Sequence, residues 1–63
     1  MEYTKRELKI LKLLSEGNTK DSIQDRLAIS KLTLDKDLAV LKAKFNAFNL
    51  PNLIYLATKQ NVI

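Results

Sequence analysis

Residues 29–45, ISKLTLDKDLAVLKAKF, decide the fold of this chain. Apolar side chains recur there at i, i+4, i+7 and i+11, as Leu34, Leu38, Leu41 and Phe45. This spacing places them along one face of an α-helix. Ser30 precedes the stripe as an N-cap, because its hydroxyl can accept a hydrogen bond from a free backbone N–H of the first turn. Asn46 tolerates positive φ and can end the helix. The pattern predicts a helix over residues 31–45.

Capping signals predict three further helices, over residues 5–16, 19–27 and 51–60. Thr4 and Glu7 form a capping box before the first of them, and Gly17 can supply the left-handed residue that ends it. Thr19 caps the second helix, and Pro51 suits the first turn of the last. A chain of 63 residues makes one domain. We therefore predict that residues 1–63 form a single all-α domain of four helices.

The residue types in the chain argue against catalysis. There is no cysteine and no histidine, which removes thiolate chemistry, the commonest general base and the commonest metal ligand. Asp35 and Asp37 stand two residues apart on a predicted helix, so their carboxylates point in divergent directions. We predict that the protein is not an enzyme and holds no metal and no cofactor.

The charge balance favours an acidic partner. Eleven Lys and Arg residues against seven Asp and Glu give a formal charge of +4, which is typical of proteins that meet nucleic acid or an anionic membrane surface. An ordinary lysine-rich surface gives the same count. The N-terminus has no apolar segment of a signal peptide, and nowhere do 18 apolar residues run together. We predict a cytoplasmic protein without a membrane partner.

Three segments, residues 4–7, 10–17 and 29–34, follow the residue order of one protein family. They resemble the LuxR/GerE-type DNA-binding domain, which reads T-x-R-E-x-E-V-L-x-L-L-A-x-G and I-S-x-x-T-V-K-x-H at these places. The resemblance implies a four-helix, helix-turn-helix domain that regulates transcription, with its third helix in the DNA major groove and its fourth often at a dimer contact. The chain departs from the family at Asp35, where Lys is usual, and at Asp37, where His is usual.

A helical wheel at 100° per residue sorts the side chains of the helix predicted over residues 31–45. Five residues lie opposite the apolar stripe and are predicted to face the bases: Leu32, Lys36, Ala39, Val40 and Ala43. Asp35 is added because its position often reaches the bases in the resembling family. An apolar side chain can meet a thymine methyl group, and Asp can accept a hydrogen bond from cytosine N4. Asp35 would also repel phosphates, and the same face could dock onto a protein groove.

The predicted phosphate contacts lie at the starts of the second and third helices and on the flanks of the third, at Thr19, Lys20, Ser30, Lys31, Thr33, Lys42 and Lys44. Free backbone N–H groups and lysines coincide at the two helix starts. On the wheel, Asp37 shares one flank with Lys44. We expect Asp37 to be solvated there, among lysines.

The last helix carries more apolar side chains than so small a core can cover. This surplus predicts self-association through Ile54, Tyr55 and Val62, with a loosely covered end of a small domain as the alternative. The resulting hypothesis is a sequence-specific transcriptional regulator that binds double-stranded DNA as a homodimer. Asp35, Asp37 and the apolar outer side of the third helix favour an alternative, a helix-turn-helix domain that acts as a protein-interaction module and pairs with or modulates another regulator.

Overall fold

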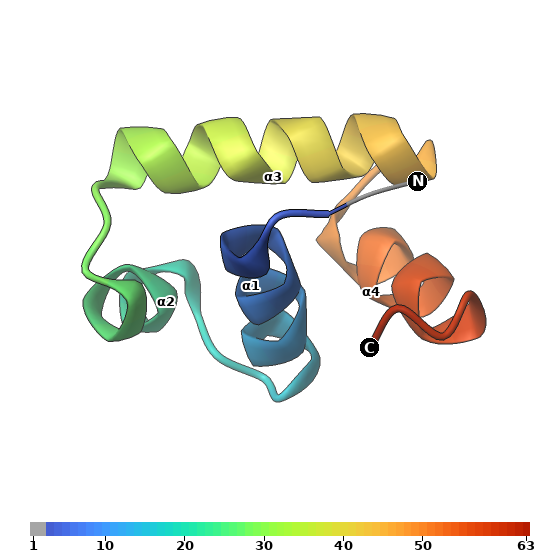
Figure 1. The fold of residues 1–63 in the computed structure, drawn as a ribbon, viewed down its shortest axis with the longest axis horizontal. Helices are drawn as coiled ribbons and strands as arrows, with labels where there is room; N and C mark the ends of the chain where they lie inside the picture. The colour runs from blue at the N-terminus through green and yellow to red at the C-terminus, as the bar shows by residue number, and fades with distance from the viewer. Residues whose placement is uncertain (1–2) are drawn as a thin grey trace.

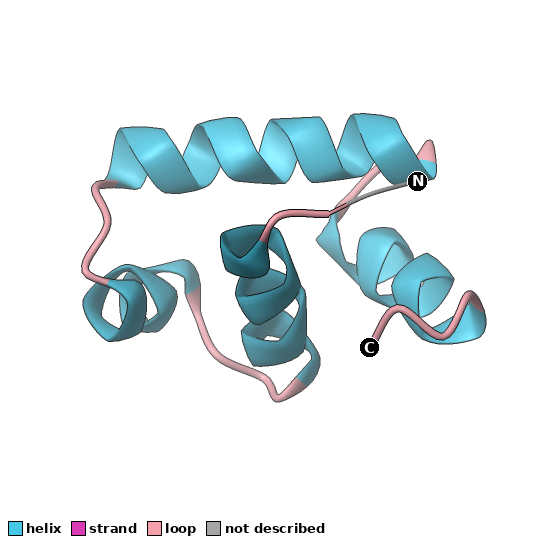
Figure 2. Cartoon of the chain, viewed as in Figure 1, coloured by secondary structure: helices cyan, strands magenta, loops and turns pink. Residues whose placement is uncertain are grey.

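The computed structural model describes residues 3–63, which contain four helices and no strand (Figures 1 and 2). The helices are α1 (Lys5–Ser15), α2 (Lys20–Leu27), α3 (Lys31–Phe45) and α4 (Leu50–Lys59). The predicted all-α, four-helix fold is confirmed. Helix α4 begins one residue earlier than expected because Asn49 is its N-cap, so that Pro51 lies second in the helix and not first.

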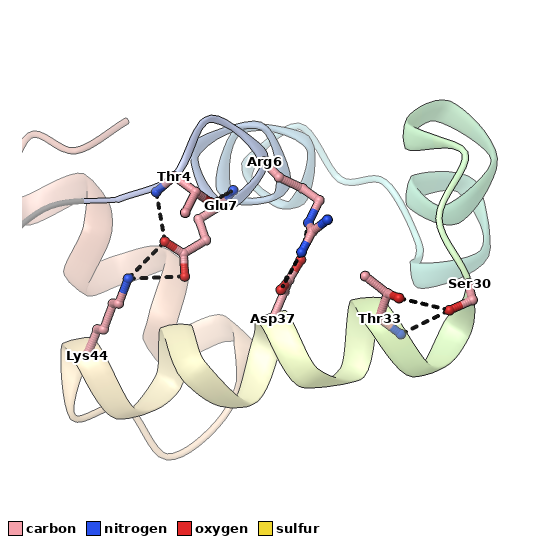
Figure 3. Close-up of polar contacts among 7 residues, drawn as sticks. All are labelled: Thr4, Arg6, Glu7, Ser30, Thr33, Asp37 and Lys44. Atoms are coloured by element: carbon pink, nitrogen blue, oxygen red, sulfur yellow. Dashed lines mark hydrogen bonds and ion pairs between the residues drawn. The ribbon is translucent and has the colours of Figure 1, made fainter.

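Side-chain caps set the starts of the helices. Thr4 Oγ1 accepts a hydrogen bond from the Glu7 N–H at 3.0 Å, and Glu7 Oε1 accepts one from the Thr4 N–H at 2.9 Å, which is the predicted capping box. Ser30 Oγ accepts a hydrogen bond from the Thr33 N–H at 3.1 Å at the start of α3 (Figure 3). Each cap satisfies a backbone donor that the helix leaves unpaired, worth about 1 kcal/mol.

Residues with positive φ stand at or just after the ends of all four helices, and Asn61 (φ 59°) is the one that follows α4. Gly17 (φ 90°) and Asn46 (φ 56°) adopt the positive φ that was expected of them. Ala28, which ends α2 with φ 53° and ψ 46°, was not anticipated, because alanine pays a steric cost of about 1–2 kcal/mol in this conformation. The short turn over residues 28–30 redirects the chain from α2 into α3.

Helix α3 lies across one side of the molecule, and α1, α2 and α4 all lie beneath it in Figure 1. The predicted apolar stripe of α3 is its buried face. Side chains from all four helices join it in the core, which comprises Ile10, Leu11, Leu14, Ile23, Leu34, Leu38, Leu41, Phe45, Leu53 and Ala57. This packing leaves the opposite side of α3 in solvent.

Candidate nucleic-acid interface

The side of α3 that points away from the other helices is mostly apolar. Leu32 is 66% exposed and Val40 is 46% exposed, and Lys36, Ala39 and Ala43 are also exposed. We call these five residues the outer face of α3. Lys36 is the only charged member of this face, and it stands between Leu32 and Val40, four residues from each.

Asp35 lies at the edge of the outer face, on the flank next to α2. Its carboxylate Oδ1 is 3.9 Å from Lys20 Nζ, and both side chains are about half-exposed. Exposed pairs of this kind contribute only about 0–1 kcal/mol. The Asp35 carboxylate is therefore held loosely, and the pair shows that the start of α2 lies beside the first half of α3.

Asp37 occupies the opposite flank, and the expectation that it is solvated among lysines is wrong. Its carboxylate accepts hydrogen bonds from Arg6 of α1, from Nε at 2.6 Å and from Nη2 at 3.2 Å (Figure 3). The Asp37 side chain is only 15% exposed. The hydrogen bond and the charge of Asp37 raise the pKa of Arg6 above its ordinary value. The wheel gives the angle of Asp37 but could not reveal that α1 covers this flank.

Lys44, a predicted phosphate contact, is also turned toward α1. Its Nζ donates to both carboxylate oxygens of Glu7, at 2.8 and 3.1 Å (Figure 3), and lies 5.3 Å from the centroid of the Tyr3 ring. The Glu7 side chain is 6% exposed and that of Lys44 is 27% exposed. Burial opposes ionisation of Glu7, but the hydrogen bonds from Lys44 and the Thr4 N–H outweigh it, so the pKa of Glu7 lies below its ordinary value.

The other predicted phosphate contacts remain on accessible surface or at its edge. Thr19 and Ser30 are exposed N-caps, with hydroxyls that accept hydrogen bonds from backbone N–H groups at 3.2 and 3.1 Å. Ser30 Oγ also donates to Thr33 Oγ1 at 3.0 Å. Six of the seven predicted positions are exposed or half-buried without a strong ion pair in the described residues: Thr19, Lys20, Ser30, Lys31, Thr33 and Lys42.

The predicted dimer residues differ in their exposure. Tyr55 of α4 is 58% exposed, whereas Ile54 and Val62 are half-buried and pack against the core. Phe48, in the loop between α3 and α4, is exposed as well, although it was not among the predicted dimer residues. Tyr55 is thus the predicted residue with the most surface left for a partner.

Two structural features bear on other classes of protein. Within residues 3–63, no group of three His, Cys, Asp or Glu side chains could hold a metal ion. Across the same residues, every helix is too short or too polar to cross a membrane. Neither feature identifies a binding partner. The class of protein is identified from the arrangement of the helices.

Helices α2 and α3, joined by a tight turn, with α3 capped and exposed along one side, define a helix-turn-helix domain. Residues 1–57 match the family described as GerE, bacterial regulatory proteins of the luxR family. The chain belongs to this family, which confirms the resemblance. By class the protein is therefore a DNA-binding regulator. The family is one of regulatory domains and not of enzymes. Comparisons with curated proteins and with solved structures gave no match.

Proposed function

We propose that the protein is a sequence-specific, cytoplasmic transcriptional regulator that inserts the outer face of α3 into the major groove of double-stranded DNA. The observation that carries the proposal is this exposed face, which runs along a helix of 15 residues capped at its start. Such a helix is about 22 Å long, and the major groove is wide enough to admit it. Asp35 and the five residues of the outer face would meet the base edges.

The proposed phosphate contacts cluster on one flank of α3 and at the start of α2. Lys31 and Lys42 share this flank with Asp35, and the pair between Lys20 and Asp35 brings the start of α2 beside it. Thr19, Ser30 and Thr33 add hydroxyl groups at the two helix starts. Lys44 is omitted from the proposed contacts because its ammonium group already binds the buried carboxylate of Glu7.

We further propose that the protein binds DNA as a homodimer through the exposed side of α4. Tyr55 would lie at the centre of this contact because it is the exposed large hydrophobic residue of α4, with Ile54 and Val62 at its edge. A dimer would read two half-sites about one turn of the DNA helix apart, roughly 10 base pairs.

The test is a selection of genomic DNA fragments by the purified protein, followed by affinity measurements at several salt concentrations. The logarithm of the affinity should fall linearly with the logarithm of the salt concentration, because phosphate contacts release counterions. Lys36→Ala should weaken binding to the selected fragments. Lys9→Ala is the matched control, because Lys9 is exposed on α1 and lies outside the outer face. A protein without DNA affinity even at low salt would overturn the proposal.

A second candidate function is a protein-interaction module that pairs with or modulates another regulator. The exposure of Leu32, Val40 and Phe48 favours it, because helices often bury apolar side chains of this kind in a groove of a partner. Two results together would establish this function instead. The protein would retain no fragment in the DNA selection, and it would bind a purified regulator at high salt through a contact that Leu32→Glu abolishes.

A further inference from the structure

We infer that Leu32 and Val40 are specificity-determining residues that read thymine methyl groups on either side of the base pair reached by Lys36. The inference deepens the proposed function and rests on it: α3 must enter the major groove for these side chains to meet bases. It assigns the preferred DNA a chemical character, namely thymines at two positions within each half-site.

Exposure and spacing single out these two side chains. Leu32 is 66% exposed and Val40 46%, although branched apolar side chains are usually buried. Each stands four residues, about 6 Å of helix rise, from Lys36. The two are therefore about 12 Å apart along α3, which corresponds to at most three or four base-pair steps of about 3.4 Å.

The chemistry of the groove edge selects thymine. In the major groove, thymine alone among the four bases presents a methyl group, which lies beside its O4 acceptor. Leu32 and Val40 have no polar side-chain atoms, so a polar base edge pressed against either of them would lose water without gaining a partner. Lys36, between them, can donate to the O6 and N7 atoms of guanine.

The rest of α3 allows this close approach. Ala39 and Ala43 complete the outer face with small side chains. On the flank nearest Val40, Asp37 is bound by Arg6 and Lys44 by Glu7, so their charged groups are drawn toward α1. Apart from the carboxylate of Asp35 at its edge, the outer face would thus present only alkyl groups and a single ammonium group to the bases.

The experiment uses the whole chain and a DNA fragment that the protein itself has selected. Each thymine of the fragment is replaced in turn by deoxyuridine, which removes only the methyl group. We expect an affinity loss of about fourfold, the value of one buried methyl-sized group, at two positions no more than four base-pair steps apart. Leu32→Ala should remove the sensitivity at one position, and Val40→Ala at the other.

Leu8→Ala is the control, because Leu8 is a partly exposed apolar residue of α1; it should leave both sensitivities intact. Circular dichroism melting curves would verify that the variants fold. Binding that is indifferent to deoxyuridine, or a sensitivity that survives in both α3 variants, would overturn the inference while leaving the proposed DNA binding in place. If no fragment is selected at all, the proposed function itself fails and the inference fails with it.

Discussion

Replacing Lys44 by Met would remove the cation from a carboxylate that the fold has buried. Lys44 Nζ donates to both oxygens of Glu7, whose side chain is 6% exposed. Methionine retains an apolar stem of similar length beside Tyr3, so the substitution removes charge more than packing. The Thr4 N–H, at 2.9 Å, stays as a hydrogen-bond donor to Glu7.

The magnitude follows from how far each group is buried. Removing one partner of a fully buried ion pair costs about 3–5 kcal/mol, and leaving a buried polar group unsatisfied costs about 1–3 kcal/mol. Lys44 is 27% exposed and Thr4 continues to donate, so we expect the smaller cost, about 1–3 kcal/mol. At about 0.05–0.15 kcal/mol per residue, a chain of 63 residues has a free energy of unfolding of only about 3–9 kcal/mol. The variant should therefore lose a large share of its stability.

The loss should depend on pH because Glu7 titrates. In the native protein the pKa of Glu7 lies below its ordinary value of 4.5, so its stabilising contribution is present above that value and is lost as the pH falls through the folded pKa. Without Lys44, burial is opposed only by the hydrogen bonds with Thr4, so the pKa of Glu7 should rise relative to that in the native protein, and protonation relieves the buried charge at a higher pH. The difference in unfolding free energy between the two proteins should shrink from about pH 7 toward about pH 4.

Urea unfolding followed by far-ultraviolet circular dichroism measures this difference. Lys42→Met is the matched control, because Lys42 lies in the same last turn of α3 and loses the same favourable interaction with the helix dipole. It has no ion pair with Glu7. Equal losses in the two variants, or a loss in Lys44→Met that does not shrink in acid, would refute the reasoning.

Three further predictions concern the end of α2, the edge of the outer face and the partner surface. Ala28→Gly should raise the free energy of unfolding by about 1 kcal/mol, because glycine adopts the left-handed conformation of Ala28 without steric cost; a decrease on urea unfolding would contradict this. Asp35→Ala should change the preference at one base pair in the fragment selection, whereas a uniform gain in affinity would show that Asp35 is only a repulsive charge. Tyr55→Glu should shift the protein toward the monomer in analytical ultracentrifugation, while Ser15→Glu, on exposed surface of α1, should not; a dimer that survives Tyr55→Glu would exclude α4 as its contact.

The helices were predictable because their signals are local. The capping box of Thr4 and Glu7 lies within four residues, and the stripe of α3 repeats within each turn of the helix. Where local signals compete, the prediction fails by a residue, as at α4, where Asn49 was not recognised as the cap and Pro51 was taken as the first residue. The left-handed conformation of Ala28 was missed because a local signal is lacking there, since nothing in the residue type of alanine favours this conformation.

The ion pairs of α3 with α1 could not be predicted in the same way. Arg6 and Asp37 are 31 positions apart in the chain, and Glu7 and Lys44 are 37 apart. A helical wheel gives the angle of Asp37 and Lys44 but not the identity of the neighbouring helix. The only signal in the sequence is that Arg6 and Glu7 carry charges opposite to those of Asp37 and Lys44. Many other pairings of charged residues satisfy this signal equally well.

These pairs make the two flanks of α3 electrostatically unequal, and this inequality bears on how α3 could meet DNA. On the α1 side, Asp37 and Lys44 are matched by Arg6 and Glu7 and attach the helix to the domain. On the other side, the flank formed with the start of α2 carries three lysines, Lys20, Lys31 and Lys42, against two aspartates, Asp35 and Asp21. Its surplus of one positive charge would attract one sugar-phosphate backbone more strongly than the other. In the proposed complex the phosphate attraction would thus be stronger at one edge of the groove, and the apolar outer face, with Lys36 at its centre, would discriminate among the bases.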